Sequence, residues 1–312
     1  MEKTTIASVP RRRFGKGDLE ISIIGLGGFH IGSVDSDEEA TAIVNRALDA
    51  GINFFDNAWE YHDGLSESRI GKALGSRRKE AIVMTKVCTH GRDKKVAMGM
   101  LEESLRRLKT DYIDVWQIHE VIYDNDPDMI FRPNGAAEAL AEAKKQGKVR
   151  MIGFTGHKDP EIHLRMLRSG FPFDTVQMPL NAFDATFRSF EQHVLPEAQK
   201  RGIAVLGMKS MGGSGEMIKK GGITPANALH YAMSLPVATT ISGINSMMVL
   251  EQNLEIVRNF QPLSESEMAN IRNRSRLWAA DGHLELFKTT TMYDGKIGRQ
   301  QHGYPEVEKL PA

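Results

Sequence analysis

Eight short apolar runs, each followed by a stretch of helical periodicity, constrain the fold of this chain most strongly. These β-branched runs predict strands at residues 22–28, 53–58, 81–87, 112–120, 149–156, 174–181, 203–210 and 238–243. Several are almost continuously apolar, which is typical of parallel strands buried on both faces. Eight strand–helix units without a linker rich in Pro, Gly or Ser favour a closed (β/α)8 TIM barrel of the α/β class over an open sheet.

The stretches between the strands carry helix boundary signals. Ser36 with Glu39 predicts a capping box at the start of the first long helix. Thr224 followed by Pro225 predicts an N-cap with proline at the first helical position. Ser246 is predicted to begin the eighth helix.

The length of 312 residues suits one domain built on such a barrel. We expect residues 1–20 to form an N-terminal hairpin under the barrel floor, with the arginines Arg11 to Arg13 in solvent. Residues 21–260 are expected to form the barrel. Residues 261–312 are expected to add an extra helix near 264–279 and then an irregular C-terminal tail.

Composition excludes several classes of partner. Forty basic side chains balance forty acidic ones, so neither nucleic acid nor a membrane surface is an expected partner. No apolar run approaches the ~18 residues of a membrane span, and the N-terminus lacks the apolar core of a signal peptide. The sequence therefore predicts a cytoplasmic protein. It leaves the oligomeric state open.

The sequence contains no complete motif for a metal site or for a Rossmann-type nucleotide site. The single cysteine, Cys88, excludes an internal disulfide and any metal or iron–sulfur site built from several thiolates. No pair of histidines has the spacing of metal ligands, so no metal site is predicted. The segment GLGGFHIG imitates a dinucleotide-binding fingerprint, but His30 occupies the place of its third glycine.

Three consecutive predicted strands carry polar groups at or near their ends. Asp56 ends the second run and Tyr61 follows five residues later, while Lys86 lies in the third run and His119 in the fourth. The carboxyl ends of barrel strands meet at one mouth, where active sites form. Taken singly, Asp56 is equally well explained as a turn residue, and His119 as a hydrogen-bonded histidine of the core. A lysine buried in a strand needs a counter-ion, which Asp56 on the adjacent strand can supply.

These segments resemble the aldo-keto reductases. NFFDNAWEYHDGLSE, TKV and IHE match that family's motifs in order and spacing, and the similarity covers roughly residues 12–260. The resemblance implies an oxidoreductase that transfers a hydride between a nicotinamide cofactor and an aldehyde or ketone, or the corresponding alcohol. It implies a catalytic tetrad of Asp56, Tyr61, Lys86 and His119.

The chemistry of the four groups suits these roles. Carbonyl reduction places negative charge on oxygen, so Tyr61 is expected to act as general acid. A free tyrosine has a pKa of ~10, and the Lys86 cation is expected to lower the pKa of Tyr61 while Asp56 holds the lysine. His119 is expected to donate a hydrogen bond to the carbonyl oxygen.

The resemblance also implies where the cofactor binds. The nicotinamide carboxamide is expected against Thr155, Gly156 and Gln177, and the pyrophosphate under the loop 209–215. Many relatives have asparagine at the position of Gly156 and a stacking tyrosine at that of Met208. The full predicted cofactor set is Gly27, Gly28, Asp56, Thr155, Gly156, Gln177, Met208, Lys209, Met211, Gly213, Gly243, Asn245, Gln252 and Asn253.

NADP(H), the usual cofactor of the family, is expected together with NAD(H). Many NADPH-preferring relatives carry an arginine four residues before the asparagine of the eighth helix, and a lysine six residues before that arginine. Here those positions hold Val249 and Gly243. The string GMKSMGG resembles a bacterial branch in which some members have a cysteine-rich tail. This tail has no cysteine, so no iron–sulfur cluster is expected.

The substrate is predicted only as a small carbonyl compound. We expect Trp59, Tyr61, His119 and Tyr123 to contact it in an apolar mouth that includes Val121, Ile122 and Phe183, with the tail 283–304 closing over it. Two other hypotheses remain. The chain is alternatively a regulatory subunit that binds the cofactor on the same barrel without significant turnover, or an aldolase that uses Lys86 as a Schiff base.

Overall fold

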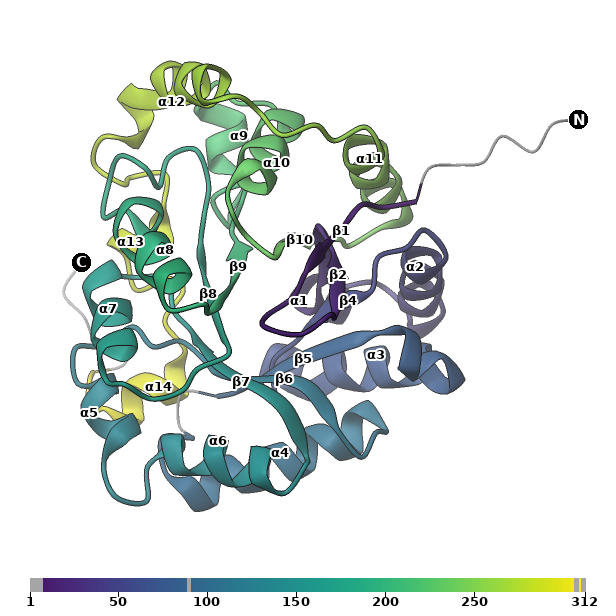
Figure 1. Cartoon of the computed structure of the whole chain (residues 1–312), viewed down its shortest axis with the longest axis vertical. Coiled ribbons are helices and arrows are strands. Elements are labelled where there is room, and N and C mark those ends of the chain that lie inside the picture. The colour runs from purple at the N-terminus through teal and green to yellow at the C-terminus, as the bar shows by residue number, and fades with distance from the viewer. Residues whose placement is uncertain (1–7, 89–90, 306–308, 310–312) are drawn as a thin grey trace, which may run out of the picture.

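The computed structural model describes residues 8–88, 91–305 and 309. Eight strands close into a barrel in the order β10-β3-β4-β5-β6-β7-β8-β9, and all neighbours pair in parallel (Figure 1). Each strand lies inside a predicted run, so the predicted barrel is confirmed. The strands are β3 (Ile24–Gly27), β4 (Phe54–Asp56), β5 (Ile82–Val87), β6 (Ile113–Ile118), β7 (Val149–Thr155), β8 (Thr175–Pro179), β9 (Ala204–Met208) and β10 (Thr239–Gly243).

Helices surround the barrel (Figure 1). Ser36, Thr224 and Ser246 each accept a hydrogen bond from the backbone three residues on, which confirms the predicted N-caps. The capping box predicted for Ser36 and Glu39 is only half formed, because the Glu39 side chain does not bond back to the Ser36 N–H. The helices are α1 (Gly28–Gly32), α2 (Asp37–Asp49), α3 (Leu65–Leu74), α4 (Lys94–Leu108), α5 (Asp126–Phe131), α6 (Ala136–Lys145), α7 (Pro160–Arg168), α8 (Phe190–Lys200), α9 (Glu216–Lys220), α10 (Pro225–Ser234), α11 (Met247–Arg258), α12 (Glu265–Ala279), α13 (Leu286–Thr289) and α14 (Lys296–Gln301), with 3-10 turns η1 (Tyr61–Gly64) and η2 (Gly75–Glu80).

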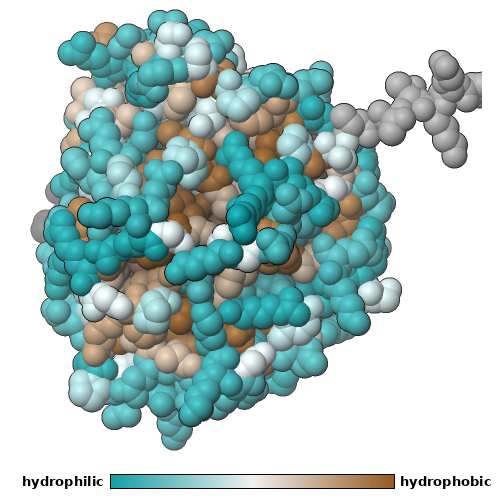
Figure 2. Space-filling view, in the orientation of Figure 1, coloured by the Kyte–Doolittle hydropathy of each residue, from teal (hydrophilic) through white to brown (hydrophobic). Residues whose placement is uncertain are grey.

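The N-terminal hairpin closes one end of the barrel. Strands β1 (Arg11–Arg13) and β2 (Glu20–Ser22) pair antiparallel and lie across the middle of the barrel in Figure 1. Phe14 and Ile21 are buried in one cluster with barrel residues, and the Phe14 and Phe54 rings meet edge to face at 5.8 Å. In the same view the rim is mostly hydrophilic, with hydrophobic residues visible toward the middle (Figure 2).

Arg12 departs from the prediction of a solvated arginine segment. Arg11 and Arg13 are exposed, but Arg12 donates to the carbonyl oxygens of Met233 (2.5 Å) and Val237 (2.8 Å). These oxygens lie at and just beyond the C-terminal end of α10, where helical carbonyls lack intrahelical partners. Arg12 therefore fastens the hairpin to the helix layer.

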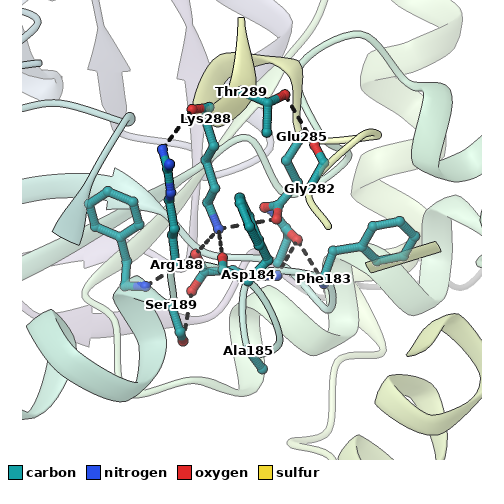
Figure 3. Close-up of polar contacts among 12 residues, drawn as sticks. Phe183, Asp184, Ala185, Arg188, Ser189, Gly282, Glu285, Lys288 and Thr289 are labelled. Carbon is teal, nitrogen blue, oxygen red and sulfur yellow. Dashed lines mark hydrogen bonds and ion pairs between the residues drawn. The ribbon is translucent and has the colours of Figure 1, made fainter. Parts of the chain in front are cut away.

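The C-terminal segment is more ordered than predicted. Helix α12 begins with a capping box at Ser264, as expected of a helix near 264–279, but α13 and α14 interrupt the predicted irregular tail. Lys288 of α13 forms ion pairs with Asp184 (2.7 Å) and Glu285 (3.1 Å), and all three side chains are fully buried (Figure 3). Asp184 follows β8, so the ion pair fixes the C-terminal segment to the barrel.

The helices were compared with the length and apolarity that a membrane span requires. Within residues 8–88, 91–305 and 309, none is both long and apolar enough to cross a bilayer.

Candidate active site

The predicted tetrad converges at the carboxyl ends of β4, β5 and β6. Asp56 is the last residue of β4, Lys86 lies one residue before the end of β5, and His119 follows β6 directly. Tyr61 opens the turn η1 after β4. Parallel pairing of these neighbouring strands places all four residues at one mouth of the barrel.

Lys86 is buried and fully paired. Its ammonium donates to Asp56 Oδ1, to the carbonyl oxygen of Asn57 (2.6 Å) and to the Tyr61 hydroxyl (3.4 Å). Only 1% of its surface is exposed, so without the carboxylate the buried charge would cost several kcal/mol. Asp56 is thus the counter-ion that the sequence predicted for Lys86.

Tyr61 lies between the lysine and the histidine. Its ring meets the His119 ring edge to face at 5.6 Å, and Lys86 Nζ lies 4.9 Å from its centroid. Burial raises the pKa of Tyr61 well above its usual value, and the carboxylates of Asp56, Glu60 and Glu120 raise it further. The expectation that Lys86 lowers this pKa is therefore wrong for this arrangement, because Asp56 neutralises the ammonium and desolvation dominates.

Two carboxylates that the sequence analysis missed border His119. Glu60 Oε1 accepts a hydrogen bond from His119 Nδ1, and Glu60 Oε2 accepts one from Cys88 Sγ (2.6 Å). Glu120 follows His119, and polar atoms of Glu60, His119 and Glu120 lie within 4.8 Å of one another. Glu60 directly precedes Tyr61 and Glu120 directly follows His119 in the sequence, and this proximity to two predicted site residues could have indicated them.

The environment shifts the two groups beside Glu60 in opposite directions. Burial lowers the pKa of His119, against the pull of the Glu60 carboxylate, which raises it. Burial, followed by repulsion from Glu60, raises the pKa of Glu120 to about 8. Gly295 in the C-terminal segment donates its N–H to Glu120 Oε2 (3.2 Å). At neutral pH Glu120 is therefore largely protonated.

The opposite side of the mouth fits a carboxamide. Thr155 ends β7, Gln177 lies in β8 and Met208 ends β9, with Thr155 Oγ1 4.0 Å from the Met208 sulfur. Gln177 Nε2 donates to Asp56 (3.4 Å), while its buried Oε1 has no hydrogen bond among the described residues. A carboxamide brings two N–H donors and one acceptor, so the nicotinamide amide would satisfy this oxygen.

Close backbone packing explains two of the predicted glycines. A Cβ at Gly28 would lie 2.4 Å from the carbonyl oxygen of Asp56, and one at Gly156 would lie 2.2 Å from that of Val121. No asparagine fits at Gly156 without a shift of the backbone.

The loop after β9 lies beneath the C-terminal segment. Lys209 Nζ is 4.8 Å from the Tyr293 ring centroid and 5.4 Å from that of Phe287. Burial lowers the pKa of Lys209 to about 8. Gly213 has a φ of 75°, and a Cβ there would lie 3.1 Å from the Tyr293 hydroxyl. Met211 is partly buried in the same loop.

The far end of the predicted cofactor groove lies at α11. Asn253 Nδ2 donates to Ser242 Oγ (3.0 Å), while Asn245 and Gln252 are exposed nearby in the sequence. The His30 ring lies over Gly243, where a Cβ would be 2.3 Å from it. His30 stands at the third-glycine position of the GLGGFHIG segment, and no pattern in the sequence indicated that its ring would lie over Gly243.

The residues expected to contact substrate lie in different surroundings: Tyr61 and His119 meet at the mouth, whereas Trp59 and Tyr123 make other contacts. Trp59 donates to Glu103 (2.8 Å) and stacks under Arg107, so its ring faces α4. Tyr123 packs against the rings of His302 and Tyr304 in the C-terminal segment. Three further residues that were expected to line an apolar mouth are buried in the core: Val121, Ile122 and Phe183. The groups beside His119 are instead the carboxyl groups of Glu60 and Glu120.

The fold and site define a closed (β/α)8 barrel with a buried lysine–carboxylate pair beside a tyrosine and a histidine at its mouth. Residues 23–220 match the aldo/keto reductase family, and the chain belongs to this family. Family membership supports an oxidoreductase.

Individual proteins similar to this chain include oxidoreductases of the same family. "Uncharacterized oxidoreductase YqkF" of Bacillus subtilis is 26% identical over 307 residues, which is 85% of this chain and 96% of that protein. The aldo-keto reductase YhdN of the same species is 32% identical over 66% of this chain and 61% of its own length. The holo form of aldo-keto reductase AKR11C1 from Bacillus halodurans superposes with a TM-score of 0.73 at 25% identity, covering 89% of this chain and 99% of that one.

Proposed function

We propose that the protein is an NAD(P)H-dependent carbonyl reductase. The observation that carries this proposal is the convergence of the Tyr61 hydroxyl, the Lys86–Asp56 pair and His119 at the mouth of the barrel. A bound nicotinamide supplies the hydride, and the protein supplies the proton and the orientation.

Tyr61 acts as the general acid. Its proton passes to the carbonyl oxygen as negative charge develops there. Because the pKa of Tyr61 is raised, the phenol stays protonated across the neutral range, which favours reduction over alcohol oxidation. Lys86 and Asp56 hold the hydroxyl in place, and His119 contacts the same substrate oxygen.

The residues on the other side of the mouth fit the cofactor. Thr155 and Gln177 would hold the carboxamide, Met208 would pack on the ring, and the loop from Lys209 to Gly215 would cover the pyrophosphate. A solved aldo/keto reductase of Klebsiella pneumoniae is in complex with NADP and acetate, with 23% identity and a TM-score of 0.68. We propose NADP(H), with NAD(H) also accepted.

The substrate is an aldehyde or ketone that tolerates a polar mouth. Carboxyl groups of Glu60 and Glu120 beside His119 suit hydroxyl-bearing compounds better than purely apolar ones. Two relatives are named for sugar chemistry, L-galactose dehydrogenase of Arabidopsis thaliana and 6-dehydroglucose reductase of Novosphingobium aromaticivorans. Sugar-derived carbonyls therefore belong beside aromatic and aliphatic ones in a substrate screen.

The test measures oxidation of NADPH and NADH by absorbance across a panel of carbonyl compounds. Tyr61→Phe should lower turnover about 100-fold or more, as expected for loss of a general acid, with cofactor affinity within a few-fold. The matched control is Tyr112→Phe, because Tyr112 stacks on Arg150 (4.0 Å) and Arg78 (4.4 Å) away from the tetrad.

Three other outcomes would contradict the proposal. Full turnover of Tyr61→Phe would remove the assignment of the acid. Tight cofactor binding without turnover on any carbonyl would favour a regulatory subunit. A substrate adduct trapped on Lys86 by borohydride would favour an aldolase.

A further inference from the structure

The imidazole of His119 is held from one side by Glu60. The hydrogen bond joins His119 Nδ1 to Glu60 Oε1, and the other oxygen of Glu60 accepts from Cys88. The backbone of His119 is fixed as well, because its N–H donates to Val87 O (2.9 Å) and its carbonyl accepts from the buried Arg92 (2.9 Å). Among the described residues, no hydrogen bond reaches His119 Nε2.

This contact determines what Nε2 can do. A neutral imidazole has one N–H donor and one bare acceptor nitrogen. If Nδ1–H donates to an ionised Glu60, Nε2 is bare and cannot donate to a carbonyl oxygen. Nε2 becomes a donor only when the Glu60–His119 pair takes up one more proton, whether the pair is written as imidazolium with carboxylate or as imidazole with carboxylic acid.

We propose that Glu60 is a positioning residue for His119: it orients the ring through Nδ1 and balances the charge that lets Nε2 donate a hydrogen bond to the carbonyl oxygen of the substrate. This inference rests on the proposed reductase function, which places the substrate oxygen between His119 and Tyr61.

The charges around the ring make Glu60 the principal support of its protonated form. Burial and the Lys86 cation disfavour the imidazolium, whereas Glu60 and, more weakly, Asp56 favour it. Among the described residues, the titratable groups around the ring and its carboxylate partner are Asp56, Glu60 and Tyr61 from β4 and the loop after it, Lys86 and Cys88 from β5 and its end, Glu120 after β6, and His157 after β7.

Glu120 and His157 leave this conclusion unchanged. Burial raises the pKa of Glu120 to about 8, so at neutral pH it is largely neutral. Burial lowers the pKa of His157 well below its usual value, so His157 is neutral too. Among the described residues, Glu60 is therefore the carboxyl group in direct contact with the ring, and its removal should lower the pKa of His119.

The test uses the full-length protein with 15N-labelled histidine and the isosteric change Glu60→Gln. In the wild type, the neutral His119 ring should carry its proton on Nδ1. Glu60→Gln should shift the titration of His119 down by about one pH unit or more. It should also lower kcat/KM for carbonyl reduction at neutral pH about tenfold, move the pH profile to lower pH, and leave KM for the cofactor within about twofold.

Two controls separate positioning from general damage. Glu191→Gln makes the same change at a half-buried carboxylate of α8, which accepts a hydrogen bond from Tyr231 of α10 (2.8 Å), and it should leave the His119 titration unchanged. In a His119→Ala background, Glu60→Gln should cause little further loss. Glu60→Asp restores the charge on a shorter side chain, and it should recover the pH profile more than the turnover.

Three results would overturn the proposal: a neutral wild-type ring protonated on Nε2, an unshifted His119 titration in folded Glu60→Gln, or an undiminished effect of Glu60→Gln without His119. The first needs no variant, so a misfolded variant cannot hide it. A wild-type protein without any carbonyl turnover would refute the proposed function, while the NMR titration would still decide the Glu60–His119 coupling.

Discussion

The Lys86 ammonium is the most constrained charge at the mouth of the barrel. It is 1% exposed and bonded to Asp56, so its loss would leave a carboxylate that is itself only 5% exposed. We expect Lys86→Met to lower the free energy of unfolding by ~3–5 kcal/mol, the usual cost of breaking a buried pair. Turnover should fall as well, because Lys86 also holds the Tyr61 hydroxyl.

A double-mutant cycle checks this pairing. Asp56→Asn combined with Lys86→Met should cost less than the two single changes added together, as measured by denaturant unfolding. Additive losses would mean that the two side chains do not stabilise each other.

Prediction from sequence succeeded for residues whose position follows from a strand end. Asp56, Lys86 and His119 lie in or beside strands, so barrel topology alone brings them together. Glu60 was missed because the direction of its side chain depends on an irregular turn. Glu60 directly precedes η1, and within η1 His62 and Asp63 have positive φ angles of 51° and 55°. No periodicity reports such a turn, in which Glu60 reaches His119.

Elements with local signals were predictable in the same way. The strands followed from apolar β-branched runs, and the N-caps of α2, α10 and α11 from single residues. Helix α13 spans only four residues, which is too short for a periodic signal. It is held by the tertiary contact between Lys288 and Asp184, which lie 104 positions apart in the chain.

The Lys288 ion cluster should control docking of the C-terminal segment. In Figure 3 the Lys288 side chain extends toward Asp184 and Glu285, and the structure gives each bond at 3.1 Å or less. Lys288→Met should expose residues 282–305 to amide exchange and limited proteolysis, because two buried carboxylates lose their cation. Lys219→Met is the control, because that exposed lysine pairs with Glu216 (3.5 Å) at the surface, where solvent screens the ion pair and its contribution to stability is small.

The loosening of the C-terminal segment by Lys288→Met should depend on pH. Burial raises the pKa of Glu285 to about 7, and loss of Lys288 would raise it further, since the lysine lowers it. A carboxyl group with a raised folded-state pKa destabilises the fold as pH rises above its unfolded value. The damage from Lys288→Met should therefore be larger at pH 8 than at pH 5.5, and equal exchange at both values would contradict it.

The predicted site residues of the whole molecule fall into two groups around its mouth. The predicted acid–base groups lie on or after β4, β5 and β6. Most of the predicted cofactor residues lie on or after β7, β8, β9 and β10 or on α11, with Gly27, Gly28 and Asp56 as the exceptions. The hairpin fills the other end of the barrel, and the C-terminal segment packs over Tyr123 and Lys209 at the mouth. This packing supports the expectation that residues 283–304 close over the substrate, which stays a prediction.

We expect the choice between NADP(H) and NAD(H) to be decided beside α11. Recognition of the 2′-phosphate of NADP(H) is strongest with an arginine fork. Val249 and Gly243 occupy the positions at which many NADPH-preferring relatives have basic residues, and the His30 ring lies over Gly243. Arg46 reaches α11, but it is bonded to Glu251 (2.6 Å), which offsets its charge.

We therefore expect weak discrimination between the two cofactors, below ~2 kcal/mol or roughly thirty-fold in favour of NADPH. Paired titrations with NADPH and NADH measure it directly. Val249→Arg should raise the preference for NADPH about tenfold by adding a guanidinium beside the phosphate. Met248→Arg adds the same charge at the neighbouring, 68% exposed position and should change the ratio little. A thousand-fold preference in the wild type would mean that another cationic side chain reaches the phosphate, and equal shifts in both variants would mean that only net charge matters.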